Sequence, residues 1–109
     1  MAYDESLAGR IRDALIRTKG ILEKKMFGSV VFMLHGNMLV GVWKDSLIAR
    51  IGQDAYDDVR HEPHVREFDV TGRPMKKWVM VEPEGLDDDA SLHSWIERAI
   101  QYVETLPAK

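Results

Sequence analysis

The spacing of hydrophobic residues predicts an amphipathic helix near each end of the chain. Over about residues 4–19, apolar side chains recur every three or four positions, with acidic residues at the start and basic residues at the end, which complements the helix dipole. Gly20 follows as a helix stop. The last segment begins at the acidic run 87–89 and places seven apolar residues on one face: Leu92, Trp95, Ile96, Ala99, Ile100, Val103 and Leu106.

Between these helices the apolar pattern shortens and predicts β-strands. Three strands are expected at residues 29–34, 38–43 and 47–51, joined by short turn-prone segments into an antiparallel meander. A short helix at 53–62 and two further strands at 65–70 and 78–81 follow. The expected fold is therefore α+β, an antiparallel five-stranded sheet with the element order α-β-β-β-α-β-β-α and its helices mainly on one face.

Length and composition narrow the class of protein. A chain of 109 residues is expected to form a single domain, 1–109, with one core. The absence of cysteine excludes a disulfide scaffold, a thiol nucleophile and a thiolate metal site. No apolar run approaches the roughly 20 residues that span a bilayer, and the acidic N-terminus is unlike a signal peptide. We therefore expect a cytoplasmic protein with no membrane partner.

The formal net charge of −3 is an average over two unlike halves. Residues 1–52 carry 8 Lys/Arg and 5 Asp/Glu, whereas residues 53–109 carry 7 and 13, so the halves stand at +3 and −6. Dedicated nucleic-acid binders usually have a basic balance over the whole domain, because neutralised phosphates supply most of their affinity. Nucleic acid is thus expected to bind weakly at most.

Several short motifs resemble the TfoX N-terminal domain family. The most specific is the segment Gly72-Arg73-Pro74-Met75-Lys76-Lys77-Trp78 with Phe68 before it, and the others are Lys25-Met26-Phe27-Gly28, Phe32-Met33 and Gly36-Asn37-Met38. The resemblance runs from about Asp4 to the C-terminal helix and implies a small α+β domain with the element order given above. Longer members of the family add a helical domain and are bacterial regulators of natural competence that act with the cyclic-AMP receptor protein at promoters. The 109 residues leave room for the first domain only, so this regulatory role is not carried over intact.

Two positions depart from the family pattern, which commonly has glycine where Ser29 and Lys77 stand. Both positions carry side chains here, so a close backbone approach that needs glycine is not expected at either.

One group of basic residues is the main candidate binding site. Lys24 and Lys25 precede the first predicted strand, and an antiparallel sheet could bring them to one end with the second basic segment, Arg73, Lys76 and Lys77. One interpretation is an anion-binding site in which Phe27 or Trp78 offers an aromatic face. The other is a solvated rim, with both aromatic residues in the core and Arg73 holding the turn.

Catalytic and metal-binding patterns are weaker. His61 and His64 with Glu67 form a loose metal-ligand grouping, but Pro63 breaks the helix that would align them, so no metal site is predicted. The acidic run 87–89 is better explained as a helix cap than as a cation site. The serines stand in no nucleophile-elbow pattern, and no glycine-rich phosphate loop occurs, so we expect neither an enzyme nor a cofactor.

The strand at 38–43 is apolar on both faces. If helices cover one face, the other must meet the short helix, a ligand or a partner chain, and homodimerisation through the sheet is one hypothesis. The leading prediction is a non-enzymatic cytoplasmic interaction module, regulatory in role, that binds protein partners through the exposed sheet face and the Phe27/Trp78 end. The alternatives are a small-molecule or nucleotide-binding domain that uses Lys25, Arg73 and Lys77, and weak nonspecific DNA binding.

Overall fold

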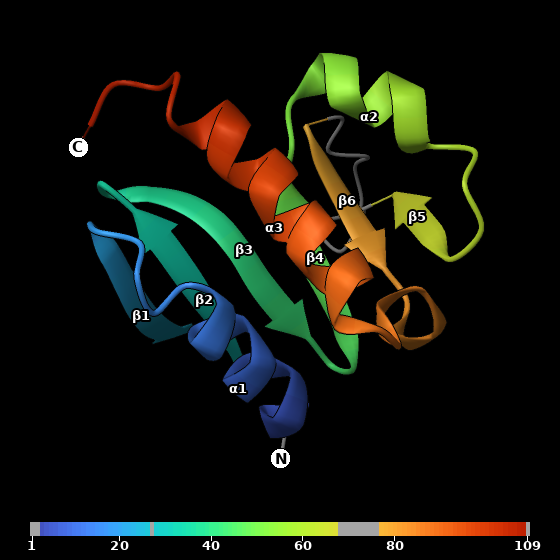
Figure 1. Cartoon of the computed structure of the whole chain (residues 1–109), viewed down its shortest axis with the longest axis horizontal. Helices are drawn as coiled ribbons and strands as arrows, with labels where there is room; N and C mark the ends of the chain where they lie inside the picture. The colour runs from blue at the N-terminus through green and yellow to red at the C-terminus, as the bar shows by residue number, and fades with distance from the viewer. Residues whose placement is uncertain (1–2, 27, 68–76, 109) are drawn as a thin grey trace.

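The fold is an antiparallel sheet with three α-helices packed against it (Figure 1). The structure, a computed structural model, describes residues 3–26, 28–67 and 77–108. In these residues the elements are α1 (Glu5–Ala14), β1 (Ile21–Met26), β2 (Ser29–Leu34), β3 (Asn37–Trp43), β4 (Ser46–Arg50), α2 (Gln53–Val59), β5 (Val65–Glu67), β6 (Trp78–Val81), the 3-10 helix η1 (Pro83–Leu86) and α3 (Asp89–Val103). The predicted α+β class is confirmed.

The sheet has six strands in the order β1-β2-β3-β4-β6-β5, and every neighbouring pair is antiparallel. The prediction of five strands missed β1, which lies between the first predicted helix and the first predicted strand. Its centre, Glu23-Lys24-Lys25, is charged on both faces and breaks the apolar alternation. An edge strand tolerates this pattern because it pairs on one side only, and lysines there discourage unwanted pairing with other chains.

Helices α1 and α3 each begin directly after an aspartate that caps the helix N-terminus. At α1 the Asp4 carboxylate accepts hydrogen bonds from the backbone N–H groups of Ser6 and Leu7, at 2.9 and 3.2 Å. At α3 the Asp88 carboxylate accepts from the Ser91 N–H at 2.7 Å, and this bond holds the pKa of Asp88 below its usual value. The acidic run before α3 therefore contains a helix cap, as predicted.

Helix α1 is shorter than the predicted span of about 4–19. It ends at Ala14, and the chain turns through residues 15–17. Leu15 is the last side chain of this segment to be buried, whereas Ile16 is 76% exposed. Packing against the sheet thus stops where the helix stops.

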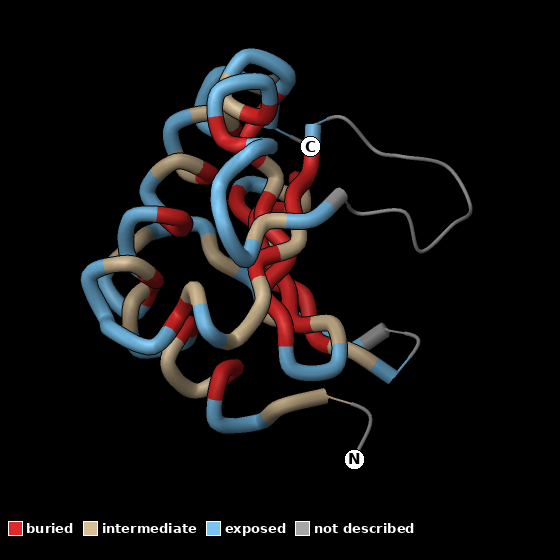
Figure 2. The backbone as a smooth tube through the Cα atoms, turned by 90° about the vertical axis from the view of Figure 1, so that its right-hand side faces the viewer, coloured by how far each residue is buried: buried red, intermediate tan, exposed pale blue. Residues whose placement is uncertain are grey.

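All three α-helices lie on one face of the sheet and share one core with it (Figure 2). Alternate residues of the central strands point into this core, among them Phe32, Val42 and Ala49. An irregularity between Phe32 and Met33 leaves one extra residue in β3, so that Leu39 and Val40 are both buried in the same core.

The Asp4 cap should stabilise the fold measurably. Replacing Asp4 with Ala removes the acceptor for two backbone N–H groups, so we expect the free energy of unfolding to fall by about 1 kcal/mol in urea denaturation. Asp4→Asn keeps an acceptor at the same place and should cost only a few tenths of that (~0.3 kcal/mol). Equal losses in both variants would contradict the cap.

An ion pair joins α1 to the edge strand β1. The Arg12 guanidinium donates to both Glu23 carboxylate oxygens, Nε to Oε1 at 2.7 Å and Nη2 to Oε2 at 2.6 Å. This hydrogen bonding lowers the pKa of Glu23.

The lowered pKa gives the Glu23 pair a defined pH dependence. The folded state favours the Glu23 carboxylate, so the stabilisation is present above the ordinary value of 4.5 and is lost as the pH falls through the folded-state pKa. We expect Glu23→Gln to destabilise the protein at pH 7 but much less at pH 3, as measured by urea unfolding at both values. Glu97→Gln, at an exposed position of α3, should show no such difference. A loss in Glu23→Gln that does not change with pH would exclude this assignment.

Candidate interaction surface

The face of the sheet that points away from the helices is the main candidate surface. The strand register lines up one residue from each of the six strands in a row across this face: Lys24, Val31, Gly41, Ile48, Met80 and Arg66. Successive side chains of a strand point to opposite faces, and the strand neighbours Phe32, Val40 and Val79 lie in the core under the helices. The row therefore points away from the helices.

Further residues on the same face extend this row on both sides. Leu22, Met33 and Met38 are aligned by the register of β1, β2 and β3, while Trp43 and Trp78 follow from the alternation along β3 and β6. We call these five residues and the row together the open face. In Figure 2 the helices lie on the left of the sheet, and its right side carries no described helix.

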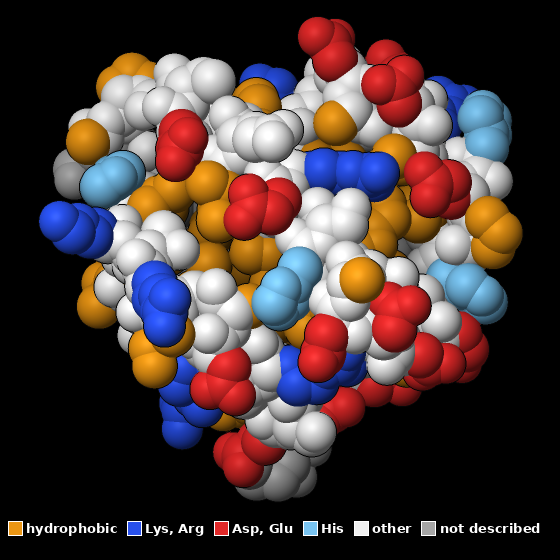
Figure 3. Space-filling model, viewed as in Figure 1, with side chains coloured by type: hydrophobic (Ala, Val, Ile, Leu, Met, Phe, Trp, Pro, Cys, Tyr) orange, Lys and Arg blue, Asp and Glu red, His pale blue; other side chains and the backbone are white. Residues whose placement is uncertain are grey.

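The open face is apolar at its centre. Val31 and Ile48 are only 8% and 7% exposed, while Met33, Met38, Trp43 and Met80 are half-buried around them. Leu22, on the edge strand, is 58% exposed. The helix-bearing side is different, because there acidic, basic and histidine side chains are interspersed with hydrophobic ones (Figure 3).

Cations stand at both ends of the central row. Lys24 is exposed on β1, and Arg66 is exposed on β5, at the opposite edge of the sheet. The Arg66 Nη1 atom lies 3.6 Å from the Glu82 Oε2 atom, and the Arg66 side chain remains 67% exposed. The pair is thus solvent-screened, and Arg66 is accessible to other anions.

Arg50 lies between two aromatic rings at the end of β4. Its guanidinium carbon is 5.7 Å from the centre of the Trp78 ring and 6.0 Å from that of Tyr102 in α3. Its Nη1 atom donates a hydrogen bond to the Met38 carbonyl at 3.5 Å, while its buried Nε has no partner in the described structure. Trp78 is 8% exposed, so its ring packs against Arg50 and offers little free surface for stacking on a ligand.

The basic residues predicted to form one site are not all described, and the described lysines of its two segments lie apart. Lys25 is exposed on β1, and the strand register aligns it across the sheet with Val81, the last residue of β6. Lys77 instead immediately precedes the first residue of β6, so the two lysines are also offset along the strand direction. Four strand spacings, about 19 Å, also separate β1 from β6. Phe27, Arg73 and Lys76 lie outside the described residues.

A second basic grouping was not predicted from the sequence. Arg60 and His61 follow α2, and with Tyr56, Val65 and Arg66 they line a cavity of about 170 Å³ between α2 and β5. Arg60 directly follows α2, and Arg66 lies six positions later in β5. No periodic pattern links them, so only the turn between α2 and β5 brings them to one cavity.

Comparison with known proteins gives one family match. The sequence model of the TfoX N-terminal domain family matches residues 13–103, which is most of the chain. No curated protein and no solved structure matches the sequence. Among the described residues, no helix has the length and apolar character needed to cross a membrane.

Proposed function

The chain belongs to the TfoX N-terminal domain family, and from this premise we propose that it is a non-enzymatic regulatory module that binds a protein partner through the open face. Family membership suggests a regulatory domain of the competence-regulator kind. The binding mode, the partner and a cytoplasmic location are the parts that we add to it.

The observation that carries this proposal is the apolar character of the open face. One face of an antiparallel sheet can remain in water, but it is then usually polar. Here the accessible described residues of that face include three methionines, Trp43 and Leu22, while Val31, Ile48 and Trp78 between them are only 7–8% exposed. Methionine side chains are flexible and polarisable, and they adapt well to the surface of a partner protein. An apolar centre with a polar rim is also the usual anatomy of a protein interface.

The rim charges indicate which kind of partner fits. Lys24 and Arg66 place positive charge at both ends of the central row. Opposite charges placed across an interface speed association and add specificity, so acidic side chains on a partner suit these two cations. We therefore propose a different protein, whose apolar patch is flanked by acidic side chains.

Two exposed hydrophobic residues allow a matched test. Leu22 lies on the open face, whereas Ile16 follows α1, and both are exposed enough to accept a charge without loss of the core. We expect Leu22→Glu to weaken binding of a captured partner about tenfold, which corresponds to about 1.4 kcal/mol, because it places a carboxylate in an apolar contact. Ile16→Glu should bind normally. Affinity capture from native lysate with quantitative mass spectrometry would identify the partner, and titration of the purified partner would give the ratio.

The outcomes separate the competing hypotheses. Equal binding by both variants would show that the open face is not the binding surface. Sedimentation velocity at high protein concentration should give a mass near 12.5 kDa. A mass about twice as large that returns to the monomer in Leu22→Glu would show that the partner is a second copy.

A second candidate function, binding of an anionic small molecule or nucleotide, draws support from the cavity between α2 and β5. Two arginines, a histidine and Tyr56 line it, and guanidinium groups bind phosphate well. The described residues that line it do not include Lys25 or Lys77 of the predicted site, and Arg73 lies outside the described residues. Weak nonspecific DNA binding is not similarly supported, because in the described residues Lys24 and Arg66 lie at opposite edges of the sheet.

This second function predicts a specific loss on substitution of Arg60. If ATP or inorganic phosphate binds in the cavity, amide NMR shifts should concentrate in α2 and β5, and Arg60→Gln should weaken binding about tenfold, the loss expected for one charge-assisted contact. Arg17→Gln removes an exposed arginine after α1 and should have no effect. The absence of saturable shifts with either anion would exclude this function.

A further inference from the structure

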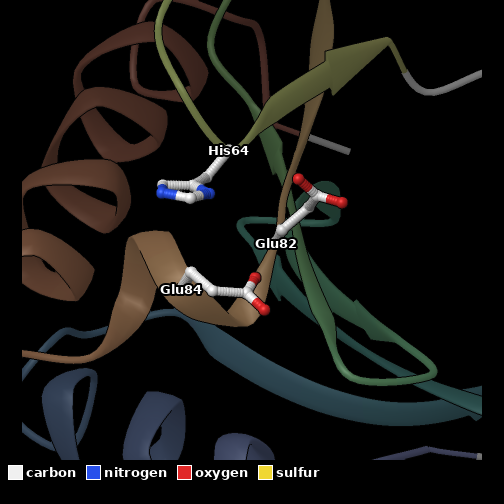
Figure 4. A group of neighbouring side chains, drawn as sticks. All are labelled: His64, Glu82 and Glu84. Atoms are coloured by element: carbon white, nitrogen blue, oxygen red, sulfur yellow. The ribbon is translucent and has the colours of Figure 1, made fainter.

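The turn before β5 and the segment after β6 bring one histidine and two glutamates together (Figure 4). One donor atom of His64, one of Glu82 and one of Glu84 all lie within 4.8 Å of one another. The two glutamates follow the histidine by eighteen and twenty positions in the sequence. The sheet pairing of β5 with β6 is what makes them neighbours.

The backbone holds this cluster in place. The Glu82 N–H donates a hydrogen bond to the His64 carbonyl at 2.8 Å, which fixes the two segments directly beside the cluster. Gly85 packs against His64, because a Cβ atom at position 85 would lie only 3.1 Å from the His64 Cβ. Glu84 stands in η1, which begins at Pro83. The three side chains thus extend from a constrained backbone, although the side chains themselves are solvent-accessible.

The charges of the cluster are incompletely balanced. Two carboxylates lie close together, and like charges at this distance repel each other. Arg66 contacts Glu82 at 3.6 Å, but no Lys or Arg in the described part of the chain forms an ion pair with Glu84. A bound cation would offset the remaining repulsion between the two carboxylates, which the Arg66–Glu82 contact offsets only in part.

We propose that His64, Glu82 and Glu84 form a binding site for a divalent transition-metal ion, with Zn²⁺ as the ion that fits best. Imidazole nitrogen suits zinc and its neighbours in the first transition row, and carboxylate oxygen completes a nitrogen–oxygen donor set that zinc accepts. Three protein ligands and one water are a common zinc arrangement. Zinc bonds of about 2.0–2.2 Å require the donors to approach more closely than 4.8 Å, and exposed side chains can do this by changing rotamers.

The site is separate from the proposed partner surface but touches it through Arg66. The Glu82 carboxylate can pair with Arg66 or bind the metal ion, so the arginine competes with the ion for this carboxylate. This competition predicts that removing Arg66 should strengthen metal binding, while the loss on substituting His64 distinguishes the site from a cluster of exposed acids alone.

Isothermal titration of the full chain, without an affinity tag, with ZnCl₂ tests the site. We expect one ion per chain, a loss of at least tenfold in affinity for His64→Gln and for Glu84→Gln, and a severalfold gain for Arg66→Gln. The controls are His61→Gln and Glu62→Gln, which remove a like donor three and two positions from His64 and should change the affinity less than twofold. Thermal unfolding without zinc should be unchanged in every variant, which shows that folding is intact.

The same titrations can overturn the proposal. Wild-type affinity in both His64→Gln and Glu84→Gln would exclude these residues as ligands. An equal loss in His61→Gln would place the metal elsewhere on the turn, and weaker binding in Arg66→Gln would contradict the competition. The Leu22→Glu variant should bind zinc normally, so failure of this site and failure of the partner surface are distinguishable.

Discussion

The burial of the α3 apolar stripe against the sheet is the interaction on which the rest of the structure depends. Its five most buried side chains, Leu92, Trp95, Ile96, Ala99 and Val103, are between 0% and 6% exposed and belong to the same core as the central strands. This packing decides which face of each strand is core. Because side chains alternate along a strand, it also decides which residues form the open face, and a shift of the register by one residue would exchange the two sets.

Links from α1 complete this arrangement. Arg10 donates to the Leu86 carbonyl at 2.7 Å and contacts Asp89 at 3.1 Å, which ties α1 to the start of α3. Arg12 ties α1 to the edge strand through Glu23. Helix α1 therefore fixes β1 relative to the core, and with it the positions of Leu22 and Lys24 at one end of the open face. Partner binding through that face would use a surface that is already assembled, at little cost in conformational entropy.

The sequence pattern predicted the main elements because their periodicity is local. The α3 stripe, the β2 to β4 meander and the capping acid before α3 each follow from residues a few positions apart. The pattern missed β1, since a charged edge strand needs only one hydrogen-bonded neighbour and shows no apolar alternation. It also grouped Lys25 with Lys77 by charge alone, although three strands of the sheet separate β1, which contains Lys25, from β6, which begins directly after Lys77.

By itself, the sequence determined the α+β class, the family and the presence of a strand with two apolar faces. Only the tertiary structure decided which of those faces is covered, where Lys24 and Arg66 stand relative to it, and that His64 meets Glu82 and Glu84 and not only its sequence neighbours. The physical reason is the range of the interactions. Helix caps and hydrophobic periodicity act within one or two turns, whereas strand order and register join residues tens of positions apart, and sites built across strands exist only after those pairs have formed.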